Sequence, residues 1–121
     1  MLNEKIFSDS PLSLEDIKEI NDTQLSLLDR HHLRLLGHCL SCFKMMKNGL
    51  SSGPLPDQKI RVKWCLEHPK LCQDEVFIGV LLEEFEAAAN QLEKLASDLE
   101  VTPLELTLTD LIKVSLKMKS S

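Results

Sequence analysis

The strongest constraint on the fold of this chain is a run of apolar residues spaced three and four positions apart. The run comprises Ile78, Leu81, Phe85, Ala88, Leu92, Leu95 and Leu99. This spacing places all its members on one face of an α-helix. The polar residues between them fall on the opposite face: Glu83, Glu86, Asn90, Glu93, Lys94 and Ser97. The pattern therefore predicts a long amphipathic helix up to residue 99, with Asp74 as its N-cap.

Start and stop signals predict three further helices before this one. The first covers residues 14–20, after a possible capping box at Ser13–Asp16. The second covers residues 23–48 and ends at Gly49. Its predicted apolar stripe is Leu25, Leu28, His32, Leu35, Leu36, Cys39, Phe43 and Met46. The third is a helix of roughly ten residues between Asp57, a suitable N-cap, and Pro69, which ends it.

The C-terminal segment carries two competing patterns. Leucines at 104, 106 and 108 alternate as in a strand, whereas Thr102, Pro103 and Glu105 form a helix start signal. We favour a helix over 104–118, because the chain offers no second strand with which to pair. An aromatic content of only 4% also favours helices. The prediction is an all-α bundle of four or five helices, in one domain over 1–121 with a loose lead-in at 1–12.

Charge and hydropathy restrict the partners and the location that we expect. The net charge of −5 disfavours binding to nucleic acid and to anionic lipid surfaces. The N-terminal residues lack the apolar core of a signal peptide, and no apolar run approaches the ~20 residues of a membrane span. We therefore expect a cytoplasmic protein with no membrane partner, for which a nucleic-acid partner is disfavoured and in which the four cysteines are reduced.

A cysteine cluster is the clearest candidate for a metal site. A Cys-x-x-Cys pair at Cys39 and Cys42 is followed by Cys65 and then by His68 or Cys72, a set that could supply four zinc ligands. Zinc pairs usually lie on tight turns, whereas this pair falls inside a predicted leucine-rich helix. We therefore predict thiols buried in the core, with no metal and no cofactor, and keep a metal- or redox-sensing protein as a third hypothesis.

No catalytic constellation accompanies the other polar residues. His31, His32 and His38 cluster with Asp29 and Arg30 on the second predicted helix, but without a nucleophile elbow, a phosphate loop or a metalloprotease motif. We expect exposed histidines, with His32 in the apolar stripe as a core residue. The chain is therefore predicted not to be an enzyme.

Residues 95–103 resemble the corner of a helix–turn–helix motif. Leu95-Ala96, Leu99 and Val101-Thr102 match its pattern, while Glu100 occupies the turn position that usually holds glycine. The resemblance implies a transcriptional regulator that reads DNA through residues 92–112. Residues 104–112 contain two acids and no lysine or arginine, so we predict a corner used for packing and keep DNA binding as the second hypothesis.

The preferred functional hypothesis rests on residues 76–82, which are apolar on every side of the predicted helix. One bundle of this size covers one such face, and an uncovered patch usually marks an interface. The predicted interaction residues are Phe77, Val80, Leu82, Glu83 and Glu86. We expect a small intracellular regulatory or adaptor protein that binds another protein through this surface, with a homodimer as one form of pairing.

Overall fold

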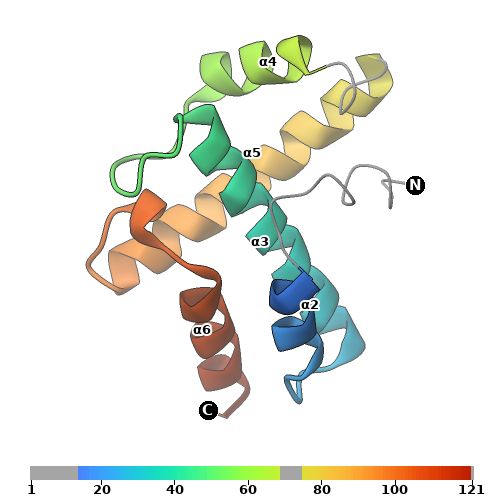
Figure 1. Cartoon of the computed structure of the whole chain (residues 1–121), viewed down its shortest axis with the longest axis vertical. Coiled ribbons are helices and arrows are strands. Elements are labelled where there is room, and N and C mark those ends of the chain that lie inside the picture. The colour runs from blue at the N-terminus through green and yellow to red at the C-terminus, as the bar shows by residue number, and fades with distance from the viewer. Residues whose placement is uncertain (1–13, 69–74, 121) are drawn as a thin grey trace.

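The computed structural model describes residues 14–68 and 75–120. These residues form five α-helices and one short 3₁₀ helix, without any strand in the described ranges, so the predicted all-α bundle is confirmed (Figure 1). The helices are α2 (Leu14–Asn21), α3 (Leu27–Met46), α4 (Gln58–Glu67), α5 (Glu75–Asp98), η1 (Pro103–Glu105) and α6 (Leu108–Ser120). Ser13, Pro69 and Asp74, each predicted to begin or end a helix, lie outside the described residues.

Helix α3 is shorter than the predicted helix at both ends. It begins at Leu27 rather than Thr23, because the Ser26 hydroxyl accepts a hydrogen bond from the Asp29 amide at 3.1 Å and caps the helix there. It ends at Met46, where Asn48 and Gly49 adopt positive φ angles of 58° and 79°. The left-handed residue that closes the last turn is Asn48, whose amide donates to the Met45 carbonyl oxygen, so the helix ends two residues before the predicted end and Gly49 lies one position beyond the closing residue.

The C-terminal segment is helical, but not continuously from residue 104. The Thr102–Glu105 box closes only the single 3₁₀ turn η1, in which the Thr102 amide donates to the Glu105 carboxylate at 2.7 Å. A second box then starts α6: the Asp110 amide donates to the Thr107 hydroxyl at 3.2 Å, and the Thr107 amide donates to the Asp110 carboxylate at 3.0 Å. The prediction of one helix over 104–118 is therefore wrong in its first turn.

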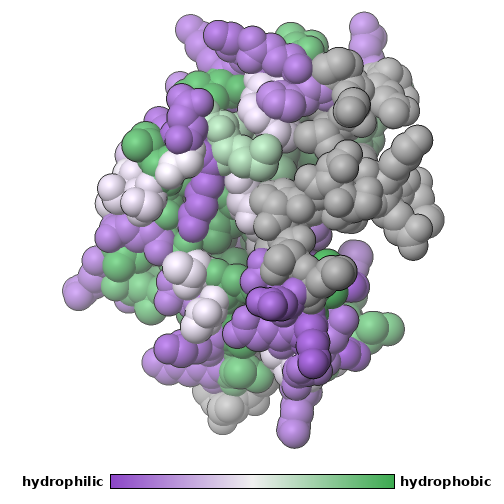
Figure 2. All heavy atoms as spheres, viewed as in Figure 1, coloured by the Kyte–Doolittle hydropathy of each residue, from purple (hydrophilic) through white to green (hydrophobic). Residues whose placement is uncertain are grey.

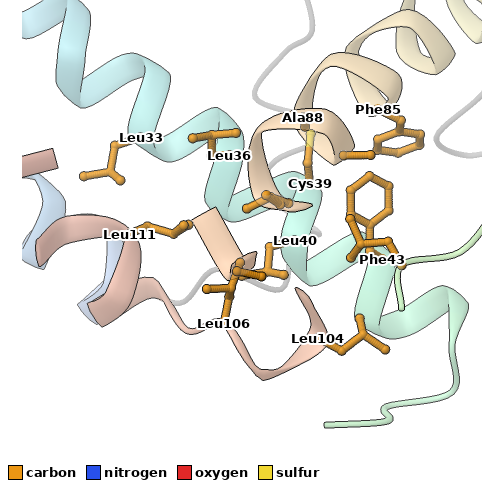
Figure 3. Packing of buried hydrophobic residues seen from close by; sticks show 14 of the residues in the cluster. Leu33, Leu36, Cys39, Leu40, Phe43, Phe85, Ala88, Leu104, Leu106 and Leu111 are labelled. Atoms are coloured by element: carbon orange, nitrogen blue, oxygen red, sulfur yellow. The ribbon is translucent and has the colours of Figure 1, made fainter. Parts of the chain in front are cut away.

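Helix α3 is the centre of the fold. It packs against α2, α4, α5 and α6, and α5 crosses it rather than lying alongside it (Figure 1). Where α3 and α5 meet, the rings of Phe43 and Phe85 have centroids 5.3 Å apart. Leu104 and Leu106 from the η1 segment are fully buried in the same core (Figure 3). The alternation that resembled a strand therefore belongs to an extended connection that inserts two leucines into the core.

The buried face of α3 differs from the predicted stripe in its first half. Leu28 is 77% exposed and His32 is also exposed, whereas Leu33 is buried. A step of one residue turns a helix by about 100°, so the true stripe lies one position further along. From Leu36 onwards prediction and structure agree, and Cys39, Phe43 and Met46 are buried. His38 and Leu40 are buried as well, because α5 and α6 both pack against this part of α3.

Candidate interaction surfaces

The N-terminal half of α5 is the first candidate surface. None of its residues up to Glu84 is buried, and all the buried residues of α5 lie between Phe85 and Ala96. Val76 is 78% exposed and Val80 is 43% exposed. A helix that is apolar on every side is normally enclosed. Residues 76–82 of α5 are apolar, but the other described residues do not fully cover them.

The structure divides the five predicted interaction residues into three groups. Val80, Glu83 and Glu86 are exposed. Phe77 is half-buried, and Leu82 is half-buried and packs against the core cluster. Part of the Leu82 side chain therefore contributes to the packing of α5 on the core, whereas the sequence analysis predicted it to be an interaction residue. Val76, absent from the predicted set, is the most exposed large apolar residue in the described part of the chain.

A groove between the end of α3 and α4 is the second candidate surface. Its volume is about 640 Å³, and it is lined by residues 45–48 and 50 on one side and by Ile60, Lys63, Trp64, Glu67 and His68 on the other. Met45 and Leu50 are 48% and 54% exposed, whereas Trp64 is 8% exposed and lies at the floor. Sequence reasoning missed this groove, because its residues come from two helices and the loop between them.

Trp64 is held in place by its neighbours in and beneath the groove. The His68 ring stacks on the indole with centroids 4.4 Å apart, and His68 Nδ1 lies 2.7 Å from the Trp64 carbonyl oxygen. On the core side, the Phe85 ring meets the indole edge-on at 6.3 Å. Contacts on two sides fix the orientation of this aromatic ring, so the floor of the groove is preformed.

A smaller hollow of about 300 Å³ lies between α2, α3 and the start of α6. Lys44 lines this hollow, and its Nζ donates a hydrogen bond to the Leu106 carbonyl oxygen at 2.7 Å. Burial lowers the pKa of Lys44, and the nearby Asp110 carboxylate opposes this effect. The contact spans 62 positions of sequence and satisfies a backbone oxygen, so Lys44 has a structural role here.

The described cysteines lie on α3 and α4 and differ in their burial. Cys39 is buried against Ala88 of α5, Cys65 is fully buried in α4, and Cys42 is half-buried (Figure 3). Burial raises the pKa of the Cys39 thiol far above its ordinary value, with smaller contributions from Cys42 and Glu84. In the part of the chain that the structure describes, no three His, Cys, Asp or Glu side chains are grouped to hold a metal ion. Cys72 lies outside that part.

The predicted roles of two histidines are exchanged in the structure. His38 is buried with 7% of its surface exposed, whereas His31 and His32 are exposed. Burial, and to a lesser extent the charge of Arg34, lowers the pKa of His38 to about 4. His38 is therefore neutral at physiological pH, and the prediction that His32 is the core histidine is wrong.

The corner that resembles a helix–turn–helix motif lacks a recognition helix. Glu100 has a φ of 60°, the conformation that glycine usually supplies at this turn. The residues after it form η1 and an extended link before α6 begins at Leu108, so 104–112 is not one continuous helix. Thr102 Oγ1 instead accepts a hydrogen bond from the Gly53 amide at 2.8 Å. This contact supports the predicted use of the corner for packing.

The exposed surface is mostly hydrophilic on the face shown in Figure 2, where hydrophobic residues form small separate patches. Among residues 14–68 and 75–120, no helix combines the length and the apolar character needed to span a membrane. A protein-family model described as "NDH complex assembly factor CRR9" matches residues 12–120 of the chain. No curated protein and no solved structure matches the chain.

This family match overturns two predictions made from the sequence. The chain is not a generic regulatory or adaptor protein, and neither a transcriptional regulator nor a metal or redox sensor fits a family described by the assembly of one complex. The predicted cytoplasmic location is also wrong, because the match points to the chloroplast. The location prediction relied on the absence of a signal peptide and of a membrane span, and the regulatory or adaptor prediction relied on the apolar residues 76–82. Neither feature specifies a compartment or a particular complex.

Proposed function

The chain belongs to the family described as NDH complex assembly factor CRR9, and from this membership we propose that it acts in the chloroplast in the assembly of an NDH complex. The observation that carries the proposal is the family match over residues 12–120. An assembly factor works by binding the proteins that it helps to assemble, so the role that we propose is non-enzymatic.

We place the contact with the complex on the N-terminal half of α5, through Phe77, Val80, Leu82, Glu83 and Glu86, with Val76 beside them. Val76 and Val80 supply exposed apolar area, and Phe77 and Leu82 are half-buried, so part of each side chain remains accessible. Removing such area from water is worth about 25 cal/mol per Å², which makes this part of α5 a favourable contact.

The charge of α5 indicates the chemistry of the partner. Helix α5 contains six acidic residues and one lysine, and Glu83 and Glu86 are exposed next to Val80. Acidic side chains around an apolar centre select a partner with complementary basic residues at the rim. The occupant that we propose is therefore a protein of the NDH complex that presents apolar side chains flanked by lysine or arginine.

The chain offers a closely matched pair of variants to test this proposal. Val80 and Leu99 are both 43% exposed, one in α5 and the other directly after its C-terminal end. Val80→Glu should abolish co-purification of NDH proteins with the tagged chain and should lower the amount of assembled complex in plants that lack the natural protein. Leu99→Glu should change neither. Equal effects of the two variants, or normal assembly in plants without the chain, would refute the proposal.

A second copy of the chain could cover the same α5 residues in place of an NDH protein. A measurement of the molecular mass in solution distinguishes these two possibilities. We expect light scattering to report a single chain at high micromolar concentration when no NDH protein is present. A dimer that Val80→Glu converts into a folded monomer would assign the surface to self-association instead.

A further inference from the structure

We propose that the groove between α3 and α4 binds an acidic, amphipathic helical segment of a partner protein. The groove is separate from the α5 surface, and its lining combines exposed apolar side chains with basic residues. Three properties carry the inference: the depth and chemistry of the lining, the charge around it, and the rigidity of its floor.

The lining suits apolar side chains inserted from above. Met45 and Leu50 lie in the wall with about half of their surfaces exposed, and Ile60 and Met46 lie deeper. Methionine adapts its shape to different partners, and grooves that receive amphipathic helices use it for this reason. A volume of about 640 Å³ is enough for several large side chains, so the occupant should present more than one apolar anchor.

The charge of this region is opposite to that of the chain as a whole. Helix α4 contains three basic residues, Lys59, Arg61 and Lys63, and one acid, Glu67. Lys47 and Lys63 line the groove itself, together with one acid, Glu67, so the charged side chains of the lining are basic on balance. The whole chain carries a net charge of −5, and most of its acids lie elsewhere, with six in α5. Charge complementarity therefore selects acidic residues on the segment that enters the groove.

The apolar lining favours a protein over a nucleic acid. A phosphate backbone would pair with the lysines but would leave Met45, Leu50 and Trp64 without a partner. An amphipathic helix with acidic flanks matches both features at once. Trp64 is the single tryptophan of the chain and lies at the floor, so its fluorescence reports directly on occupancy.

The test uses a library of overlapping 20-residue peptides from the NDH proteins and from an equal number of unrelated soluble proteins. Retained peptides should be amphipathic and negatively charged. The strongest binder should shift the emission of Trp64, and raising the salt concentration from 50 to 500 mM should weaken its binding at least tenfold. Retained peptides that are neutral or basic, or that leave Trp64 unchanged, would overturn the inference. Acidic amphipathic binders would uphold the inference whether they come from NDH proteins or from unrelated ones, since it identifies the partner by its chemistry.

Variants locate the binding on the molecule. Leu50→Asp and the double variant Lys47→Glu/Lys63→Glu should each weaken peptide binding at least tenfold. Leu66→Asp is the matched control, since Leu66 is 66% exposed on α4 but does not line the groove. Circular dichroism checks that each variant is folded. Equal losses with Leu50→Asp and Leu66→Asp would overturn the inference. So would a 20-base-pair DNA duplex that binds more tightly than any peptide and is insensitive to Leu50→Asp.

Discussion

The buried histidine of α3 predicts a specific loss of stability in mild acid. Burial of His38 next to Arg34 lowers its pKa to about 4 from the ordinary value of 6.5. Between these pH values the unfolded chain binds a proton at His38 that the folded chain does not bind. The contribution of His38 to the free energy of unfolding is therefore fully present above pH 6.5, and it is lost as the pH decreases towards 4.

The size of the effect follows from the two pKa values. One pKa unit corresponds to about 1.4 kcal/mol, so His38 should remove about 2 kcal/mol of stability by pH 5 and about 3 kcal/mol by pH 4. Urea denaturation followed by circular dichroism at pH 7.5 and 5.0 measures this change. Carboxylates also titrate in this range, so the useful quantity is the difference between the wild-type chain and a variant without the histidine.

Two variants isolate the contribution of His38. His38→Gln should remove about 2 kcal/mol of the difference in unfolding free energy between pH 7.5 and 5.0, whatever its stability at pH 7.5. His32→Gln replaces an exposed histidine six residues away and should keep the wild-type difference. If the two variants depend on pH in the same way, His38 is not held neutral by burial and the reasoning fails.

Three further predictions concern packing, backbone and thiols. Leu92 is fully buried in α5, so Leu92→Ala should lower the free energy of unfolding by about 2–5 kcal/mol. Glu93 is exposed, so Glu93→Ala should change it by less than about 0.5 kcal/mol. Equal effects of the two variants in a urea titration would mean that α5 buries a different face. Glu100→Gly should raise the unfolding free energy by about 0.5–1 kcal/mol, since Glu100 has a φ of 60°, and a lower melting temperature would contradict this. N-ethylmaleimide should label Cys42 roughly tenfold faster than Cys39, whose pKa is raised by burial, and mass spectrometry showing the reverse order would place Cys39 at the surface.

The parts of the fold that could be predicted from sequence are those set by local rules. The spacing from Ile78 to Leu95 identified the face of α5 that packs inwards, because a long helix with one continuous stripe has only one way to bury it. Asp57 marked the start of α4 correctly, since capping depends on neighbouring residues alone, whereas α3 ends at Met46, two residues before the predicted end. Leu99, the last residue of the predicted stripe, is an exception. It is 43% exposed, because α5 ends at Asp98, just before it.

The remaining features depend on contacts between distant segments. Two capping boxes lie five residues apart near the C-terminus, and only the burial of Leu104 and Leu106 against α3 and α5 separates η1 from α6. Packing of both α5 and α6 on α3 likewise decides that His38 is buried while His32 is exposed. Such pairings are not encoded in the spacing within one helix.

The candidate surfaces show the same division. Val80 could be found from the sequence, because residues 76–82 are apolar beyond the needs of one stripe. The groove could not be found, since Met45 and Trp64 lie on different helices and meet only after folding. The complex that the chain serves could not be inferred either, because docking surfaces carry no fixed motif.

Photo-crosslinking from position 80 reports whether the N-terminal half of α5 contacts a protein of the NDH complex. A photoreactive phenylalanine analogue replaces Val80 in one chain and Leu99 in a control chain, and both are irradiated in chloroplasts that are assembling the complex. We expect a crosslink to an NDH protein from position 80 and none from position 99. Crosslinks from position 80 only to a second copy of the chain, or equal yields from both positions, would contradict it.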